Sequence, residues 1–259
     1  MKIAVMGKGG SGKTTTSGVL ARSLAREGWE VVAIDCDSNP NLGISLGLGI
    51  ERTEELAAIR QALDAGEEEH APTAEEAITR FGTTGPDRVR IAVVTKIDKP
   101  QSGCPCCGIS PEQLLGELET SQRALIADME AGLGTLSRLS EGALDVVLLV
   151  TEPSHKAIEV ARIAAEVLVE RKVAKRIVVL ANKTRNAADL ERVEAALRAV
   201  PSLALVEVIA VPEDDEVLGA DAEATSPIDA APNSPAVRVL ADLARSFIRE
   251  PAALATAGA

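Results

Sequence analysis

Residues 7–15 form the sequence Gly7-Lys8-Gly9-Gly10-Ser11-Gly12-Lys13-Thr14-Thr15. A short apolar run at residues 3–6 precedes them and predicts a buried strand, and the spacing of apolar residues over 16–27 predicts a helix behind them. The sequence fits the pattern G-x-x-x-x-G-K-[ST], in which backbone N–H groups surround phosphate oxygens at the start of a helix. We therefore predict a phosphate-binding loop between the first strand and the first helix of an α/β domain.

The side chains of this loop have expected partners. Lys13 should reach the β- and γ-phosphates of a nucleotide, and the Thr14 hydroxyl should hold Mg²⁺. The glycines allow the backbone to fold around phosphate oxygens without Cβ clashes. The loop residues that we predict to bind nucleotide are Gly9, Gly10, Ser11, Gly12, Lys13, Thr14 and Thr15.

The composition limits the kinds of partner. The 259 residues carry a formal net charge of −12, which argues against nucleic-acid and membrane partners, because both need clustered Lys and Arg. No apolar run reaches the roughly 18 residues of a membrane span. We expect a cytoplasmic protein with reduced cysteines, one domain over residues 1–249 and a flexible tail at 250–259.

Further apolar runs predict a doubly wound, mostly parallel sheet with helices on both faces. The expected strands span 29–35, 89–94, 123–128, 145–151, 176–181 and 203–211, and the expected helices span 51–65, 154–171 and 235–249. Helix 235–249 carries three arginines, but acidic residues dilute their charge, so we expect it to dock onto the sheet rather than a membrane.

Carboxylates follow two of these strands. Strand 29–35 ends in Asp35-Cys36-Asp37, and strand 123–128 ends in Asp128. Ligands of parallel sheets bind at the carboxyl ends of the strands, so these side chains should lie near the phosphate loop. We predict that Asp128 holds Mg²⁺ through water, that Asp35 lies near the metal as its supporting partner, and that Cys36 packs into the sheet.

Three of the four cysteines, Cys104, Cys106 and Cys107, lie within four residues of one another. Ser110-Pro111 predicts a helix start just behind them, whose N-terminus favours thiolates. Two or three thiolates make an incomplete tetrahedral site, which a two-fold homodimer would complete with four sulfurs. Such a site would take Ni or Zn, or an Fe–S cluster, and the residues do not choose among them.

The sequence K-G-G-x-G-K-T-T at residues 8–15 resembles the deviant Walker A loop of the MinD/ParA/nitrogenase-iron-protein superclass. The resemblance implies an ATP-driven homodimer in which Lys8 reaches the partner's phosphates. It also implies that Asp37 positions the attacking water. These roles make Lys8, Lys13 and Asp37 the candidate catalytic residues.

The base end of the site also follows from this resemblance. Asn182, at the end of strand 176–181, corresponds to an asparagine that reads the adenine edge. The segment Val211-Pro212-Glu213-Asp214 resembles the V-P-x-D segment that flanks the adenine, which assigns Val211, Pro212 and Asp214 to nucleotide binding. Arg185 stands where a guanine-reading N-K-x-D motif has its aspartate, so ATP is favoured over GTP.

Within the superclass, Cys104-Pro-Cys106, Asp128-Met-Glu-Ala-Gly and Ala181-Asn-Lys-Thr-Arg-Asn resemble the CooC-type ATPases. Those proteins insert nickel into carbon monoxide dehydrogenase and bind metal through C-x-C at the dimer interface. The resemblance implies a metallochaperone whose client is an apo-metalloenzyme similar to carbon monoxide dehydrogenase. Cys107 is an extra thiol, so the ligand set stays open.

Two alternatives remain open on the sequence. An iron–sulfur-carrying ATPase of the nitrogenase-iron-protein type needs a second ligand cysteine just beyond residue 128, and residues 129–135 contain none. A MinD/ParA-like positioning ATPase needs a basic membrane helix or a DNA-binding patch, and it has no use for the cysteine cluster.

Overall fold

The computed structural model describes residues 1–37, 39–65, 73–94, 115–116, 118, 120, 123–129, 139–204 and 206–249. The three clustered cysteines and the expected helix start at Ser110 lie outside these residues.

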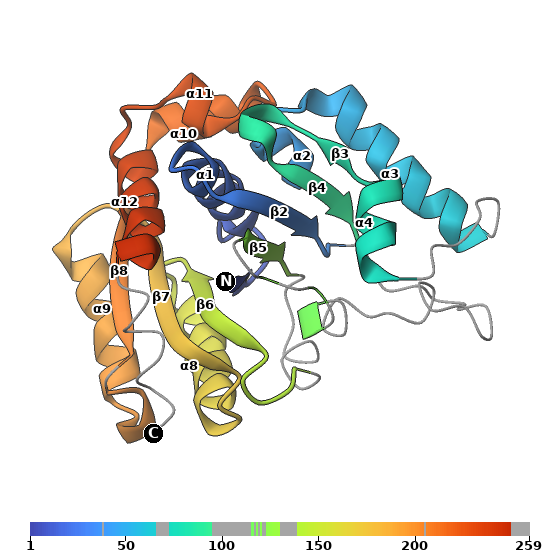
Figure 1. Ribbon diagram of the computed structural model, residues 1–259. Helices are drawn as coiled ribbons and strands as arrows, with labels where there is room; N and C mark the ends of the chain where they lie inside the picture. Colours follow the sequence, from blue (N-terminus) through green and yellow to red (C-terminus); the bar gives the residue numbers. More distant parts are fainter. Residues whose placement is uncertain are drawn as a thin grey trace.

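The described strands form one eight-stranded sheet in the order β3-β4-β2-β5-β1-β6-β7-β8 (Figure 1). All neighbouring pairs are parallel except β3 and β4. The bounds are β1 (Lys2–Gly7), β2 (Glu30–Asp35), β3 (Thr83–Thr84), β4 (Arg90–Val93), β5 (Arg123–Asp128), β6 (Leu144–Thr151), β7 (Ala174–Thr184) and β8 (Glu207–Pro212). The doubly wound, mostly parallel sheet predicted from the sequence is confirmed.

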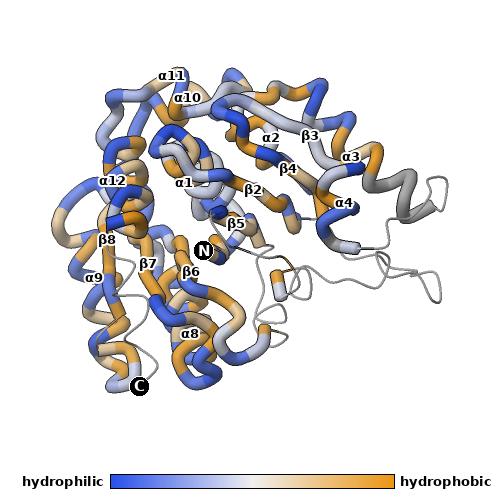
Figure 2. The backbone as a smooth tube through the Cα atoms, viewed as in Figure 1, coloured by the Kyte–Doolittle hydropathy of each residue, from blue (hydrophilic) through white to orange (hydrophobic). Residues whose placement is uncertain are grey.

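Helices cover both faces of the sheet. Their bounds are α1 (Lys13–Arg26), α2 (Leu42–Ser45), α3 (Gly49–Ala65), α4 (Ala74–Phe81), α8 (His155–Glu170), α9 (Ala187–Arg198), α10 (Asp215–Ala222), α11 (Pro227–Ala230) and α12 (Pro235–Arg249), with 3-10 turns η1 (Pro86–Arg88) and η2 (Pro201–Leu203). Most of the strands are largely hydrophobic, and the helices alternate between hydrophilic and hydrophobic residues, as Figure 2 shows. This is the pattern of strands buried on both sides and of helices with one solvent face.

Alternate residues of each strand build two separate cores. Ile3 and Val5 of β1 pack with α1 and α12 on one face, whereas Ala4 and Met6 pack with α8 and α9 on the other. The split follows from the two-residue period of a strand. Polar side chains lie at the carboxyl ends of two central strands, where Asp35 ends β2 and Asp128 ends β5.

Two strands differ from the sequence prediction by two or more residues at an end. The strand expected from residue 203 begins at Glu207, because Pro201–Leu203 forms a 3-10 turn in which Leu203 N–H donates to the Val200 carbonyl at 2.9 Å. The strand expected at 176–181 extends over Ala174–Thr184. Helices α4, α9 and α10 have no counterpart in the prediction from sequence.

The docking of α12 onto the sheet is confirmed. Its Val237, Leu240, Leu243, Ala244 and Phe247 are buried in the same core as α1. Among the described residues, no helix has both the length and the apolar character needed to cross a membrane.

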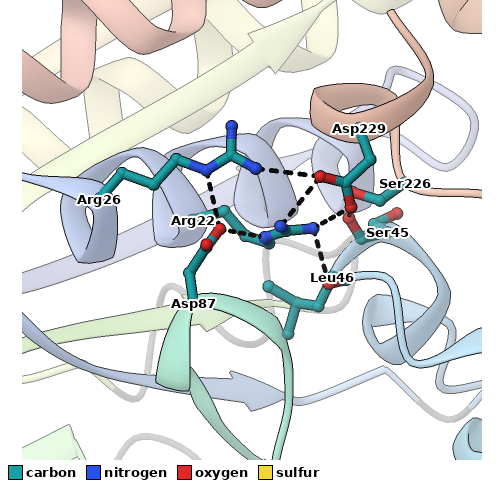
Figure 3. A network of polar contacts seen from close by, with 7 residues as sticks. All are labelled: Arg22, Arg26, Ser45, Leu46, Asp87, Ser226 and Asp229. Carbon is teal, nitrogen blue, oxygen red and sulfur yellow. Dashed lines mark hydrogen bonds and ion pairs between the residues drawn. The ribbon is translucent and has the colours of Figure 1, made fainter. Parts of the chain in front are cut away.

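A buried arginine joins α1 to three other elements (Figure 3). Arg22 Nε donates to Asp87 in η1 at 2.6 Å, Nη2 donates to Asp229 in α11 at 3.0 Å, and Nη1 donates to the Leu46 carbonyl just after α2 at 3.3 Å. Arg26, one turn further along α1, contacts the same two aspartates from an exposed position. This network holds the residues that follow α2 against α1.

Candidate nucleotide-binding site

The loop between β1 and α1 requires glycine at two positions. A Cβ at Gly7, with φ of 149°, would lie 2.1 Å from the Val150 carbonyl oxygen of β6. A Cβ at Gly12, with φ of 97°, would lie 2.2 Å from Asn182 Nδ2. The backbone of β6 therefore leaves no room for a side chain at Gly7, whereas a Cβ at Gly12 would displace the end of the Asn182 side chain.

A cavity of about 450 Å³ lies beside the loop, within the range of small-molecule sites. The predicted nucleotide-binding residues that line it are Gly10, Gly12, Lys13, Thr14, Thr15, Asn182, Val211, Pro212 and Asp214. Its lining includes the start of α1, which offers backbone N–H groups and a buried lysine, and also Val217 and Leu218 of α10. The cavity thus suits a ligand that has an anionic group and a partly apolar group.

The other loop residues lie differently. Lys8 and Gly9 are exposed on the outer side of the loop. Ser11 is buried, and its hydroxyl has no hydrogen-bond partner. Among the described residues, this hydroxyl and one carboxylate oxygen of Asp128 are unsatisfied polar atoms near the cavity. Such orphaned groups in a closed site are expected where a ligand completes the hydrogen bonding.

Asp35 and Asp128 end neighbouring strands. They are register partners of β2 and β5, and each is 1% exposed. Asp35 Oδ1 accepts the Asp37 N–H at 3.1 Å, and Oδ2 accepts the Leu42 N–H at 2.8 Å. Burial, with the nearby charge of Asp128, raises the pKa of Asp35 to about 7. Asp35 therefore anchors the chain that leaves β2.

Asp128 faces the start of α1. Burial raises the pKa of Asp128 to about 6, against the opposing effects of hydrogen bonds from Thr14 and Ser17 and of the Lys13 charge. Its Oδ1 has no hydrogen-bond partner. A partnerless carboxylate oxygen beside a threonine hydroxyl supplies the hard oxygen donors that Mg²⁺ prefers, so the residues present fit that ion.

Cys36 and Asp37, which follow Asp35, lie in different environments. Cys36 is 5% exposed within the core, so its predicted packing into the sheet is confirmed. Asp37 is half-buried, and its Oδ1 accepts the Asn39 N–H at 3.0 Å. The Asp37 carboxylate thus lies on a turn whose backbone is held by a hydrogen bond to Asp35.

The end of β7 reaches back to the phosphate loop. A register shift between Asn182 and Thr184 marks a bulge, and Lys183 within it has φ of 57°. Asn182 Nδ2 donates to the Ser11 carbonyl at 2.7 Å. Lys183 Nζ donates to the Gly10 carbonyl at 2.8 Å and to Glu152 Oε1 at 2.5 Å. Sequence reasoning missed Lys183 and Glu152, although the position of Lys183 directly after Asn182 pointed to it.

The segment after β8 is held by polar contacts of its own. Asp214 caps α10 by accepting the Glu216 N–H at 3.1 Å, and it also accepts the Ala236 N–H of α12 at 3.3 Å. Arg185 Nε pairs with Glu213 at 2.5 Å. The side chain at the position of the guanine-reading aspartate is therefore a cation engaged with a neighbouring carboxylate.

The predicted metal ligands Cys104, Cys106 and Cys107 lie outside the described residues. Within the described ranges, no group of three or more His, Cys, Asp and Glu side chains is arranged to hold a metal ion.

The fold and the loop define a P-loop nucleotide-binding protein. The chain belongs to the CobQ/CobB/MinD/ParA nucleotide binding domain family, which it matches over residues 2–228. Membership of this family, with the complete loop motif, makes the protein an ATPase of the MinD/ParA type.

The chain is also similar to individual proteins. The chain is 32% identical over 179 residues to the carbon monoxide dehydrogenase accessory protein CooC of Rhodospirillum rubrum, a match that spans 62% of this chain and 66% of that protein, just under two thirds. It is 29% identical to an uncharacterized ATP-binding protein of Methanocaldococcus jannaschii, over 84% of this chain and 87% of that protein.

Among solved structures, the septum site-determining protein MinD of Pyrococcus horikoshii, complexed with Mg-ADP, superposes with a TM-score of 0.69. The match covers 97% of this chain and 98% of that chain at 19% identity. At this identity the likeness concerns the fold.

Proposed function

We propose that this protein is an ATP-dependent, dimerising metallochaperone. It binds a metal through cysteines at the dimer interface and delivers it, nickel in our proposal, to an apo-metalloenzyme similar to carbon monoxide dehydrogenase. The observation that carries the nucleotide half is the buried, partnerless Asp128 oxygen beside Thr14 and Lys13. The similarity to CooC, together with Cys104-Pro-Cys106, supports the metal half.

At the phosphate end, Lys13 neutralises the β- and γ-phosphates from within the cavity, and Thr14 and Asp128 hold Mg²⁺, Asp128 through water. The ion supplies charge stabilisation for phosphoryl transfer. The raised pKa of Asp128 supports this assignment, because a carboxyl that is costly to ionise alone becomes favourable to ionise beside a divalent cation.

Asp37 orients the water that attacks the γ-phosphate. Asp35 influences the position of Asp37 through the backbone. Because Asp35 accepts the N–H groups of both Asp37 and Leu42, it sets where the Asp37 carboxylate can lie. Both aspartates are therefore part of the proposed site, Asp35 as a supporting residue near the metal and Asp37 as a catalytic one.

At the base end, Asn182, Val211, Pro212 and Asp214 surround the adenine. Asn182 Nδ2 donates one of its two N–H groups to the Ser11 carbonyl, which holds the side chain in place, and in the proposed complex its amide oxygen accepts a hydrogen bond from the base. An acceptor there matches the exocyclic amine of adenine and opposes the 6-oxo group of guanine. The Arg185–Glu213 pair supports the same preference.

Lys8 acts across the proposed homodimer. Its side chain is exposed at the loop, where a second subunit placed face to face could bring its own phosphates within reach. Binding of ATP would close the dimer and hydrolysis would open it. Closure would assemble four thiolates around the two-fold axis from Cys104 and Cys106 of each chain, with Cys107 as a further ligand or as an acceptor during transfer.

Metal stoichiometry measured anaerobically, with Ni²⁺ and Zn²⁺ and with ATP present, tests this proposal. Wild type should bind one metal per dimer, and Cys104→Ala and Cys106→Ala should lose the metal while keeping ATP binding. Cys36→Ala is the matched control, because this fourth cysteine is buried in the core. Metal binding at wild-type stoichiometry in Cys104→Ala, Cys106→Ala and Cys107→Ala alike would contradict the metal half of the proposal and leave only the ATPase.

A further inference from the structure

The bulge at the end of β7 presents two successive side chains to two successive carbonyls of the phosphate loop. Asn182 donates to the Ser11 carbonyl across 171 residues of chain, and Lys183 donates to the Gly10 carbonyl across 173. A regular strand would send these side chains to opposite faces of the sheet. The bulge, with Lys183 in the left-handed region, turns both toward the same loop.

Holding these carbonyls fixes the loop's peptide planes. The C=O and N–H of one trans peptide point in opposite directions. The peptide joining Gly10 and Ser11 is held at both ends, because its carbonyl accepts from Lys183 and its N–H donates to the Lys8 carbonyl at 3.1 Å. In the next peptide, the Ser11 carbonyl accepts from Asn182, so the Gly12 N–H of that peptide points away from Asn182.

Glu152 keeps the lysine in place. It follows β6 directly, and its carboxylate accepts from Lys183 Nζ at 2.5 Å. A left-handed backbone is unfavourable for a lysine, so this conformation persists because the surrounding contacts require it.

We propose that Lys183 and Glu152 are positioning residues for the phosphate-binding loop. With Asn182 and the carbonyls of Gly10 and Ser11 they form a unit, here called the loop clamp. The clamp sets the loop's peptide planes before nucleotide arrives, so that binding does not have to order them. This inference rests on the proposed nucleotide site, and it assigns Lys183 to the protein backbone rather than to the phosphates.

The test compares Lys183→Met, Lys183→Arg and Glu152→Gln with wild type. The matched control is Lys175→Met, because Lys175 lies at the other end of β7 and pairs with Asp145 at 2.8 Å. Amide hydrogen exchange of residues 9–13 is measured without nucleotide and with saturating ADP. Affinities for ADP and ATP are measured separately on the same proteins.

Lys183→Met and Glu152→Gln should speed exchange of the loop in the nucleotide-free protein, and ADP should remove most of the difference. The affinities for ADP and ATP should fall by a similar factor, about tenfold for Lys183→Met, because a charge-assisted hydrogen bond is lost. Lys183→Arg should recover part of the affinity, and Lys175→Met should match wild type in both measurements.

Three results would overturn the clamp. The first is wild-type loop exchange in the nucleotide-free variants, and the second is a loss confined to ATP, which would make Lys183 a γ-phosphate ligand. The third is faster exchange throughout the sheet, which would indicate general destabilisation. The exchange arm needs no ligand, so failure of wild type to bind either nucleotide would refute the proposed nucleotide site and leave the clamp to be judged separately.

Discussion

Asp35 and Asp128 are register partners at the carboxyl ends of β2 and β5, and each is only 1% exposed. Burial is the main cause of the raised pKa of each carboxyl: the pKa of Asp35 rises to about 7, where the charge of Asp128 adds to the effect, and that of Asp128 rises to about 6, where the charge of Asp37 adds to it. The two buried carboxyls therefore favour binding of a cation at this edge of the sheet, beside the phosphate loop.

This pair predicts how stability changes with pH in the nucleotide-free protein. The folded Asp35 holds its proton more tightly than the unfolded residue, whose pKa is about 4. Its stabilising contribution is complete below pH about 4 and is lost as pH rises toward about 7. Between pH 5 and pH 8 the free energy of unfolding should fall by roughly 2 kcal/mol more in wild type than in Asp35→Asn.

Urea unfolding at the two pH values checks this prediction, with Asp145→Asn as the control. Burial would raise the pKa of Asp145, but hydrogen bonds from Lys175 and the Lys2 N–H hold it below the usual range, so it titrates below this window. Its replacement should leave the difference between pH 5 and pH 8 unchanged. Equal pH dependence in wild type and Asp35→Asn would contradict the buried-pair assignment.

The arginine network predicts unequal losses of stability from two similar substitutions. The Arg22 side chain is 4% exposed and the Arg26 side chain 41%, although both contact Asp87 and Asp229. Burial alone would raise the pKa of Asp87, but the two arginines hold it below its usual range.

Arg22→Met should lower the free energy of unfolding by about 2–3 kcal/mol, because it leaves the Leu46 carbonyl unpaired and removes the buried partner of Asp87 and Asp229, which then keep only the exposed Arg26. Arg26→Met should lower it by about 0–1 kcal/mol. Urea unfolding at pH 7 distinguishes the two variants. Equal losses would mean that the buried position of Arg22 confers nothing beyond an ordinary surface ion pair.

Gly12→Ala should damage nucleotide binding more than stability. The new Cβ would meet the end of the Asn182 side chain, which can rotate away but then leaves the Ser11 carbonyl. ADP affinity should fall by about tenfold or more while the protein remains folded. The control is Gly28→Ala, where φ is also positive at 91° but no atom lies within 4 Å, so strain is added without the clash. ADP titration of both folded variants makes the comparison, and wild-type affinity in Gly12→Ala would contradict it.

The features that could be predicted from the sequence are those that short local motifs encode. The phosphate loop and the carboxylates after two apolar strands are recognised from short patterns, and their placement at one edge follows from parallel pairing. The contacts of Lys183 were missed because they depend on a bulge, which has no clear sequence pattern, and because they join residues 31 and 173 positions apart. The start of β8 was misplaced because the buried, apolar Leu203 belongs to a 3-10 turn rather than to a strand.

Lys13 and Lys8 should fail in different ways when replaced. Lys13 is buried in the cavity, so Lys13→Ala should weaken ATP binding and abolish hydrolysis. Lys8 is exposed on the loop, so Lys8→Ala should keep ATP binding in the monomer and lose hydrolysis and ATP-dependent dimerisation. Isothermal titration, phosphate release and light scattering separate these properties. Hydrolysis at the wild-type rate in Lys8→Ala would remove its role across the dimer.

The most direct test of an ATP-gated metallochaperone is the coupling between ATP and metal binding. Asp37→Ala should bind ATP without hydrolysing it, so the affinity for Ni²⁺ can be measured anaerobically at equilibrium, by chelator competition, with and without ATP and Mg²⁺. Because one dimer closure serves both ligands, ATP should tighten Ni²⁺ binding, and Ni²⁺ should tighten ATP binding by the same factor. The coupling should disappear in Cys104→Ala. Equal Ni²⁺ affinities with and without ATP would contradict the proposed function.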